Sequence, residues 1–184
     1  LRALGAALQE RKDELGQLWP RESGVLFKVS QHAGRIASGA LESYAALADT
    51  FPFEEECRPT AGGEFGLLVR EPVGVVGAII PWNAPVALIC HKIGPALLAG
   101  CTVVLKSAPE APGSGYLFAE AAEQIGLPPG VLNVVTADRE VSELLVTNPG
   151  VDKITFTGST AAGRRIASLC GERIARCTLE LGGK

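Results

Sequence analysis

The sequence Gly74-Val75-Val76-Gly77-Ala78-Ile79-Ile80-Pro81-Trp82-Asn83-Ala84-Pro85 decides the fold of this chain. Its apolar and β-branched first half is typical of a buried strand, and the first proline ends that strand. The next residues predict a loop, because a residue that precedes proline is disfavoured from the α conformation. A helical pattern then covers 86–99, and 102–105 predicts a second strand that ends at Lys106.

A strand, a polar loop, a helix and a second strand in this order make a βαβ unit. In such units ligands bind at the carboxyl ends of the strands. Asn83 and Lys106 both follow or end a predicted strand. We therefore expect a ligand site beside these two residues.

The alternation of strands and helices continues through the rest of the chain. Further strands are predicted at 65–70, 131–135, 153–157 and 177–181, and further helices at 113–125, 139–146 and 161 to about 170. This alternation predicts an α/β fold. We expect a Rossmann-like, doubly wound, mostly parallel sheet with helices on both faces.

The first part of the chain has a different character. Apolar residues recur at helical spacing over 1–19, Pro20 interrupts the pattern, and a second long helix is predicted over 23–48. A polar, acidic connector follows over 51–63. We therefore expect N-terminal helices and a connector (1–64) that pack on a Rossmann-like domain (65–184).

Composition excludes several classes of function. The 184 residues are 47% hydrophobic with a net charge of −3, so neither disorder nor a nucleic-acid partner is indicated. No apolar run approaches the roughly 20 residues of a membrane span. Two histidines make a histidine-built metal site improbable. Five irregularly spaced cysteines are typical of free thiols in a reducing compartment, which predicts a cytoplasmic protein.

The stretch 156–163 reads Phe-Thr-Gly-Ser-Thr-Ala-Ala-Gly, in which a strand ends, Gly158 turns the chain and hydroxyl residues open a helix. Backbone N–H groups and the helix dipole make such a turn a natural phosphate site. A helix cap at Ser159 without any ligand explains the same residues. Arg164 and Arg165 replace the Lys-Ser/Thr pair of a P-loop, which argues against an NTPase.

Three polar residues at strand ends have both a structural and a functional interpretation. The amide of Asn83 could cap the next helix or stabilise an oxyanion. Lys106 could extend its ammonium to solvent or donate to ribose hydroxyls or phosphate. Glu180 could form a structural ion pair, or act as a general base if burial raises its pKa.

Five motifs occur together in a fixed order: Pro81-Trp82-Asn83-Ala84-Pro85, Lys106, the run 126–133, the run 156–160 and Glu180-Leu181-Gly182-Gly183-Lys184. In this combination the chain resembles the NAD(P)-dependent aldehyde dehydrogenase superfamily over essentially its whole length. The resemblance implies a mechanism in which a cysteine thiolate attacks the aldehyde. Hydride then passes to the nicotinamide, and water hydrolyses the thioester to give a carboxylic acid.

The resemblance also implies roles for individual residues. Asn83 matches the oxyanion-stabilising asparagine, and Glu180 matches the base that activates water. The implied cofactor is NAD, with NADP as a possibility, and no metal is implied. The residues that match the family's cofactor contacts are Ile79, Ile80, Pro81, Trp82, Lys106, Thr157, Gly158, Ser159, Leu181 and Gly182.

The chain departs from the family pattern in three places. The nucleophilic cysteine of the family lies beyond the glycines that follow the base, and none of the five cysteines matches its motif. Pro109 stands where many NAD-using members carry a glutamate three residues after the lysine, and Glu110 follows it. Ala137-Asp138-Arg139 and Ser142 occupy a region that is glycine-rich in many members.

These features lead us to expect the cofactor-binding part of an aldehyde dehydrogenase, truncated relative to the full fold and lacking its catalytic domain. We expect this part to be inactive alone and the full-length protein to be a homo-oligomer, a dimer or a tetramer. A non-catalytic nucleotide-binding or structural relative, or a CoA-acylating aldehyde dehydrogenase, is the alternative. Retention of Asn83 and Glu180 favours the hydrolytic enzyme.

Overall fold

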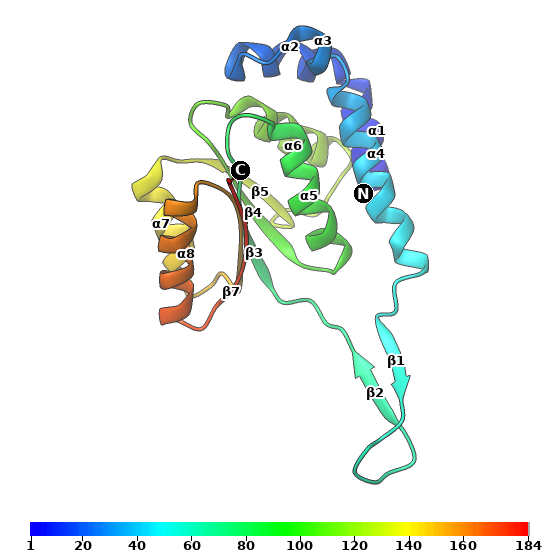
Figure 1. The fold of residues 1–184 in the computed structure, drawn as a ribbon. Coiled ribbons are helices and arrows are strands. Elements are labelled where there is room, and N and C mark those ends of the chain that lie inside the picture. The colour runs from blue at the N-terminus through cyan, green and yellow to red at the C-terminus, as the bar shows by residue number, and fades with distance from the viewer. Residues whose placement is uncertain (184) are drawn as a thin grey trace.

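The computed structural model describes residues 1–183 (Figure 1). The helices are α1 (Arg2–Glu10), α2 (Lys12–Ser23), α3 (Phe27–Ser30), α4 (Ala33–Ala46), a 3-10 turn η1 (Leu47–Asp49), α5 (Pro85–Leu98), α6 (Gly113–Gln124), α7 (Arg139–Thr147) and α8 (Thr160–Glu172). The strands are β1 (Glu54–Cys57), β2 (Gly66–Val69), β3 (Val75–Ile79), β4 (Thr102–Ser107), β5 (Leu132–Thr136), β6 (Lys153–Gly158) and β7 (Arg176–Leu181).

The main sheet has five parallel strands in the order β5-β4-β3-β6-β7. The chain builds outward from β3 in one direction through β4 and β5, and then in the other through β6 and β7. At the carboxyl end of β3, Ile79 is in register with Lys106 on one side and with Phe156 on the other. This reversal of strand order beside β3 is the point where open α/β sheets bind ligands.

Two layers of helices cover the sheet (Figure 1). Helices α5 and α6, backed by α1 and α4, cover one face, and α7 and α8 cover the other. Because side chains alternate along a strand, β3 and the residue after it serve both cores: Ala78 and Ile80 join the first, and Ile79 joins the second. The predicted doubly wound parallel fold is confirmed, and the elements after residue 74 differ from their predicted ends by one or two residues.

The N-terminal helices share the first core with the sheet. Leu4, Leu8 and Leu15 are buried together with Val103 and Leu105 of β4. Burying an aliphatic side chain is worth roughly 1.5–3 kcal/mol, so this shared core, which also contains α4, α5 and α6, fixes the N-terminal helices on the rest of the fold. The predicted boundary near residue 64 stays a prediction. In the part of the chain that the structure describes, no helix is both long enough and apolar enough to cross a bilayer.

The expected helix break at Pro20 is wrong. The chain breaks at Arg11, and Pro20 lies inside α2. A proline in a helix leaves the carbonyl four residues earlier without its N–H partner. Here the Ser30 hydroxyl donates a 2.7 Å hydrogen bond to the Gly16 carbonyl, so that oxygen keeps a partner.

The single helix expected over 23–48 is also wrong. Gly24 ends α2 in a left-handed conformation, with φ at 67°, which a glycine adopts at little cost. The chain then forms the short helix α3 before α4 begins at Ala33.

The connector contains a strand that the sequence analysis missed. Residues 54–57 form β1, which pairs antiparallel with β2 from Glu54↔Val69 to Cys57↔Gly66. Three successive glutamates give no apolar alternation by which a strand is recognised. The β1–β2 hairpin projects away from the rest of the molecule (Figure 1).

Candidate functional site

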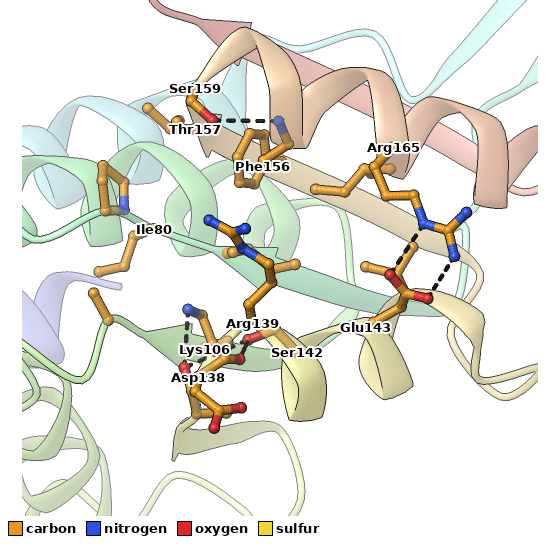
Figure 2. Close-up of a pocket in the computed structure, with 18 of the residues that line it drawn as sticks. Ile80, Lys106, Asp138, Arg139, Ser142, Glu143, Phe156, Thr157, Ser159 and Arg165 are labelled. Carbon is orange, nitrogen blue, oxygen red and sulfur yellow. Dashed lines mark hydrogen bonds and ion pairs between the residues drawn. The ribbon is translucent and has the colours of Figure 1, made fainter.

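A groove of about 520 Å³ runs along the carboxyl ends of β3, β4 and β6 (Figure 2). It lies between the loops that follow these strands and the helices α7 and α8. Most of the predicted cofactor residues line it, namely Ile79, Ile80, Pro81, Lys106, Thr157, Gly158 and Ser159. The fold therefore brings together residues that are up to 80 positions apart in the sequence, from 79 to 159.

A second cavity, of about 860 Å³, adjoins this groove. It contains both predicted catalytic residues, Asn83 and Glu180, and the predicted cofactor residues Leu181 and Gly182. Pro81 and the turn 157–159 line both spaces. The groove and the second cavity are therefore direct neighbours, separated by these shared residues. Trp82 is the exception among the predicted residues, because it lines neither space and its side chain is half-exposed.

The loop that carries Asn83 is fixed by a hydrogen bond from an N-terminal helix, α2. The indole N–H of Trp19, on α2, donates a 2.9 Å hydrogen bond to the Asn83 carbonyl oxygen. Helix α5 begins at Pro85, and no side chain caps its first turn. The capping interpretation of Asn83 is therefore wrong, and its side-chain amide is left exposed at the second cavity.

Lys106 is almost fully buried at the end of β4, with 8% of its surface exposed. Burial lowers the pKa of its ammonium group, and the nearby carboxylates of Glu110 and Asp138 oppose that shift. Its Nζ donates a 3.2 Å hydrogen bond to the Ala137 carbonyl oxygen. An ammonium has three donors, so Lys106 retains donors for a ligand in the groove.

Glu110 lines the groove although it is displaced by one position from the family's glutamate. The segment after β4 is a turn rather than a helix, so the displacement does not carry the side chain away as it would on a helix. The Glu110 carboxylate is close enough to the Lys106 ammonium to raise the pKa of that lysine against the effect of burial.

The turn between β6 and α8 is built as a helix start. The Ser159 hydroxyl accepts a 3.2 Å hydrogen bond from the Ala162 N–H, so Ser159 caps α8 as predicted, and this cap is compatible with a phosphate at the same turn. A β-carbon on Gly158 would collide with the Phe156 ring, so only glycine lets the chain turn so closely over that side chain. The positive end of the α8 dipole therefore points at the groove.

Glu180 is exposed near the end of β7. The reason is the strand order. β7 is the outer strand next to β6, where Glu180 pairs with Thr157, and among residues 1–183 nothing covers its other edge. Its carboxylate nevertheless faces the second cavity. Lys184, the last residue of the motif, lies outside the described residues.

Lys92 is a site residue that the sequence analysis missed. Only 5% of its surface is exposed, and its Nζ donates a 3.0 Å hydrogen bond to the Thr155 hydroxyl. Burial lowers its pKa from 10.5 to about 8, while the Glu180 carboxylate across the cavity favours its charged form. The signal in the sequence was a single lysine within the otherwise apolar helix that follows Asn83.

Tyr44 and His91 also line the second cavity. The Tyr44 hydroxyl and the His91 Nδ1 are 3.3 Å apart, and the two rings meet edge to face. A β-carbon on Gly94 would strike the Tyr44 ring, so this glycine allows the tyrosine to pack against α5.

The cysteines lie apart from both spaces. Cys90 and Cys101 are buried in the first core, as expected for small apolar residues. Burial raises the pKa of the Cys90 thiol to about 12, so it stays protonated at neutral pH. No cluster of metal-binding side chains occurs within the described range 1–183.

Comparison with known proteins agrees with this geometry. The chain is 48% identical to geranial dehydrogenase of Castellaniella defragrans, over all of this chain and 38% of that protein. It is 44% identical to mitochondrial succinate-semialdehyde dehydrogenase of Arabidopsis thaliana, over 94% of this chain and 33% of that protein. The chain thus spans between 33% and 38% of the length of these relatives.

Solved structures give the same result. A Mycobacterium tuberculosis aldehyde dehydrogenase complexed with NAD+ superposes with a TM-score of 0.91 at 42% identity, over 100% of this chain and 39% of that one. An E. coli NADP-dependent enzyme superposes with a TM-score of 0.93 at 36% identity, over 99% of this chain and 38% of that one. The model of the aldehyde dehydrogenase family matches residues 1–184, and the chain belongs to that family.

Proposed function

We propose that this chain forms the cofactor-binding part of an NAD(P)-dependent aldehyde dehydrogenase and supplies two groups to its active site. The strongest support is that Pro81 and residues 157–159 line both the groove and the second cavity. Asn83 and Glu180 line the second cavity, so they lie next to any ligand in the groove. A hydride acceptor in the groove would meet a carbonyl substrate across these shared residues. The nicotinamide ring supplies the hydride-accepting chemistry when NAD is bound.

The residues of the groove fit a dinucleotide. Lys106 would donate to the hydroxyls of the adenosine ribose, and the backbone N–H groups at Ser159 would face the diphosphate. Ile79 and Ile80 would form the apolar floor. Glu110 beside Lys106 favours NAD, because a carboxylate accepts ribose hydroxyls and repels a 2′-phosphate.

The second cavity would hold the aldehyde. The Asn83 amide would donate to the developing oxyanion, and Glu180 would take the proton from the attacking water. Lys92 would place a positive charge opposite Glu180, whose carboxylate in turn favours the charged form of that lysine. The cysteine nucleophile would come from outside residues 1–184, because none of the five cysteines lines either the groove or the second cavity.

We further infer a cytoplasmic homo-oligomer. The free cysteines fit a reducing compartment. The projecting β1–β2 hairpin exposes Leu67, Leu68 and Val69, and a strand edge with exposed apolar residues is suited to pairing with another subunit. Light scattering of the full-length protein would give its mass and test the dimer or tetramer.

The decisive experiment is steady-state oxidation of a panel of aldehydes by the full-length protein, followed by NADH absorbance. Asn83→Ala and Glu180→Gln should each lower kcat by roughly a hundredfold, because each removes a group that acts in the transition state. Glu123→Gln, an exposed change on α6 outside both spaces, is the control. Full activity of the Glu180→Gln variant would refute the proposed base.

A further inference from the structure

An ion pair closes one end of the groove. Arg165 of α8 and Glu143 of α7 form a two-pronged contact, with Nε to Oε2 at 3.1 Å and Nη2 to Oε1 at 2.7 Å. Both residues line the groove, and Figure 2 shows the pair beyond Phe156, at the end away from Ile80. The two bonds hold the guanidinium plane in a fixed orientation.

The position of this pair follows from the direction of the groove. One end is the wall at Pro81 and Thr157, shared with the cavity of Asn83 and Glu180. Under the proposed function the nicotinamide occupies that end. The other base of the dinucleotide must then lie at the opposite end, between α7 and α8.

The opposite end is suited to a flat aromatic ring. Its apolar lining comes from Val146, Ile166 and Leu169. The guanidinium of Arg165 adds a rigid planar face, and arginine stacks on aromatic rings through such a face. Stability alone does not account for the pair, because exposed ion pairs contribute little, and these side chains are 57% and 40% exposed.

We propose that Arg165 is a cofactor-recognition residue whose guanidinium plane stacks on the adenine ring, and that Glu143 is a positioning residue that holds this plane. This inference rests on the proposed function of the groove. It assigns to this chain an adenine contact that depends on a planar cation. A lysine at the same position would keep the charge but lose the plane.

The test measures inhibition constants of AMP and of ribose 5-phosphate, its counterpart without the base, in competition with NADH binding to the full-length protein. NADH fluorescence reports the binding. Arg165→Lys should raise the AMP constant by about fivefold to tenfold, since stacking on one base is worth about that much at a half-exposed site. Glu143→Ala should raise it by about twofold to fivefold. The constant for ribose 5-phosphate should change by less than about twofold in both variants.

A second ion pair gives the matched control. Arg2 and Glu42 form an exposed contact at 3.1 Å, with side chains 61% and 56% exposed, and neither residue lines the groove, so Arg2→Lys should leave both constants unchanged. An unchanged AMP constant in Arg165→Lys would overturn this inference while leaving the proposed function intact. Equal increases for AMP and ribose 5-phosphate would also overturn it, because Arg165 would then act on phosphate. A wild-type protein that binds neither NADH nor AMP would overturn the proposed function and this inference with it.

Discussion

The indole N–H of Trp19 donates a hydrogen bond to the backbone carbonyl of Asn83, 64 residues further along the chain. A buried side chain of an N-terminal helix thereby sets the position of the loop whose amide faces the second cavity. The N-terminal helices are thus part of the site's support as well as of the core.

Trp19→Phe should therefore impair catalysis. The variant keeps an aromatic ring in the core but loses the donor, which costs about 0.5–1.5 kcal/mol and loosens the Asn83 loop. We expect kcat of the full-length protein to fall about tenfold, with a smaller change in KM for NAD. Steady-state kinetics beside thermal unfolding would show it. A variant with a lowered Tm but wild-type kcat would mean that Trp19 serves stability alone.

Lys106→Ala should weaken NAD binding by about tenfold to a hundredfold, because hydrogen bonds from a charged donor contribute about 1.5–3 kcal/mol. Titration calorimetry of the full-length protein measures the Kd directly. Lys153→Ala is a suitable control, since Lys153 lies at the amino end of β6, whereas the groove lies at the carboxyl ends of the strands. Equal NAD affinity in Lys106→Ala and wild type would refute the assignment of this lysine.

Cofactor choice should depend on Glu110. With Pro109 at the family's glutamate position, we expect NAD to be used with unusual tolerance for NADP. Glu110→Gln should raise kcat/KM for NADP by about threefold to tenfold, because it removes a negative charge that repels the 2′-phosphate. Glu123→Gln, an exposed change on α6, is the control. A wild-type preference for NAD of several orders of magnitude would contradict the expected tolerance and mean that Glu110, or another acid, excludes NADP.

Lys92 should make stability rise with pH. Its pKa is about 8 in the folded protein and 10.5 in its unperturbed state, so between these values the unfolded chain binds the extra proton. Unfolding then becomes less favourable as pH rises through this window, and below about pH 8 the burial penalty on the charged lysine applies in full. Urea unfolding at several pH values, beside Lys92→Met, isolates this contribution. Parallel pH profiles for the two proteins would contradict the lowered pKa.

Residues 1–184 alone should not oxidise aldehydes. Covalent catalysis needs a thiolate near the carbonyl held by Asn83, and burial keeps the Cys90 thiol protonated. The assay follows NADH formation by the isolated segment and by the full-length protein. Turnover by the segment that is abolished in Cys90→Ser or Cys101→Ser would show that the nucleophile lies within this chain.

The local elements could be predicted because their causes are local. A β-branched run that ends at Pro81, a loop between prolines and a helix stopped by Gly100 each follow from backbone preferences within a few residues. The elements that were missed depend on distant partners. Pro20 is tolerated inside α2 because Ser30 satisfies a carbonyl there, and β1 exists because β2 pairs with it.

The sequence by itself determined the α/β class, the family resemblance and the residue types of the site, since motifs and periodicity are properties of neighbouring residues. Only the tertiary structure decided which of these residues meet. Strand order placed Glu180 on an exposed edge, packing of α5 buried Lys92 against Thr155, and helices α7 and α8 joined Glu143 to Arg165. The reason is physical: burial and charge interactions depend on distances through space, which a linear sequence does not contain.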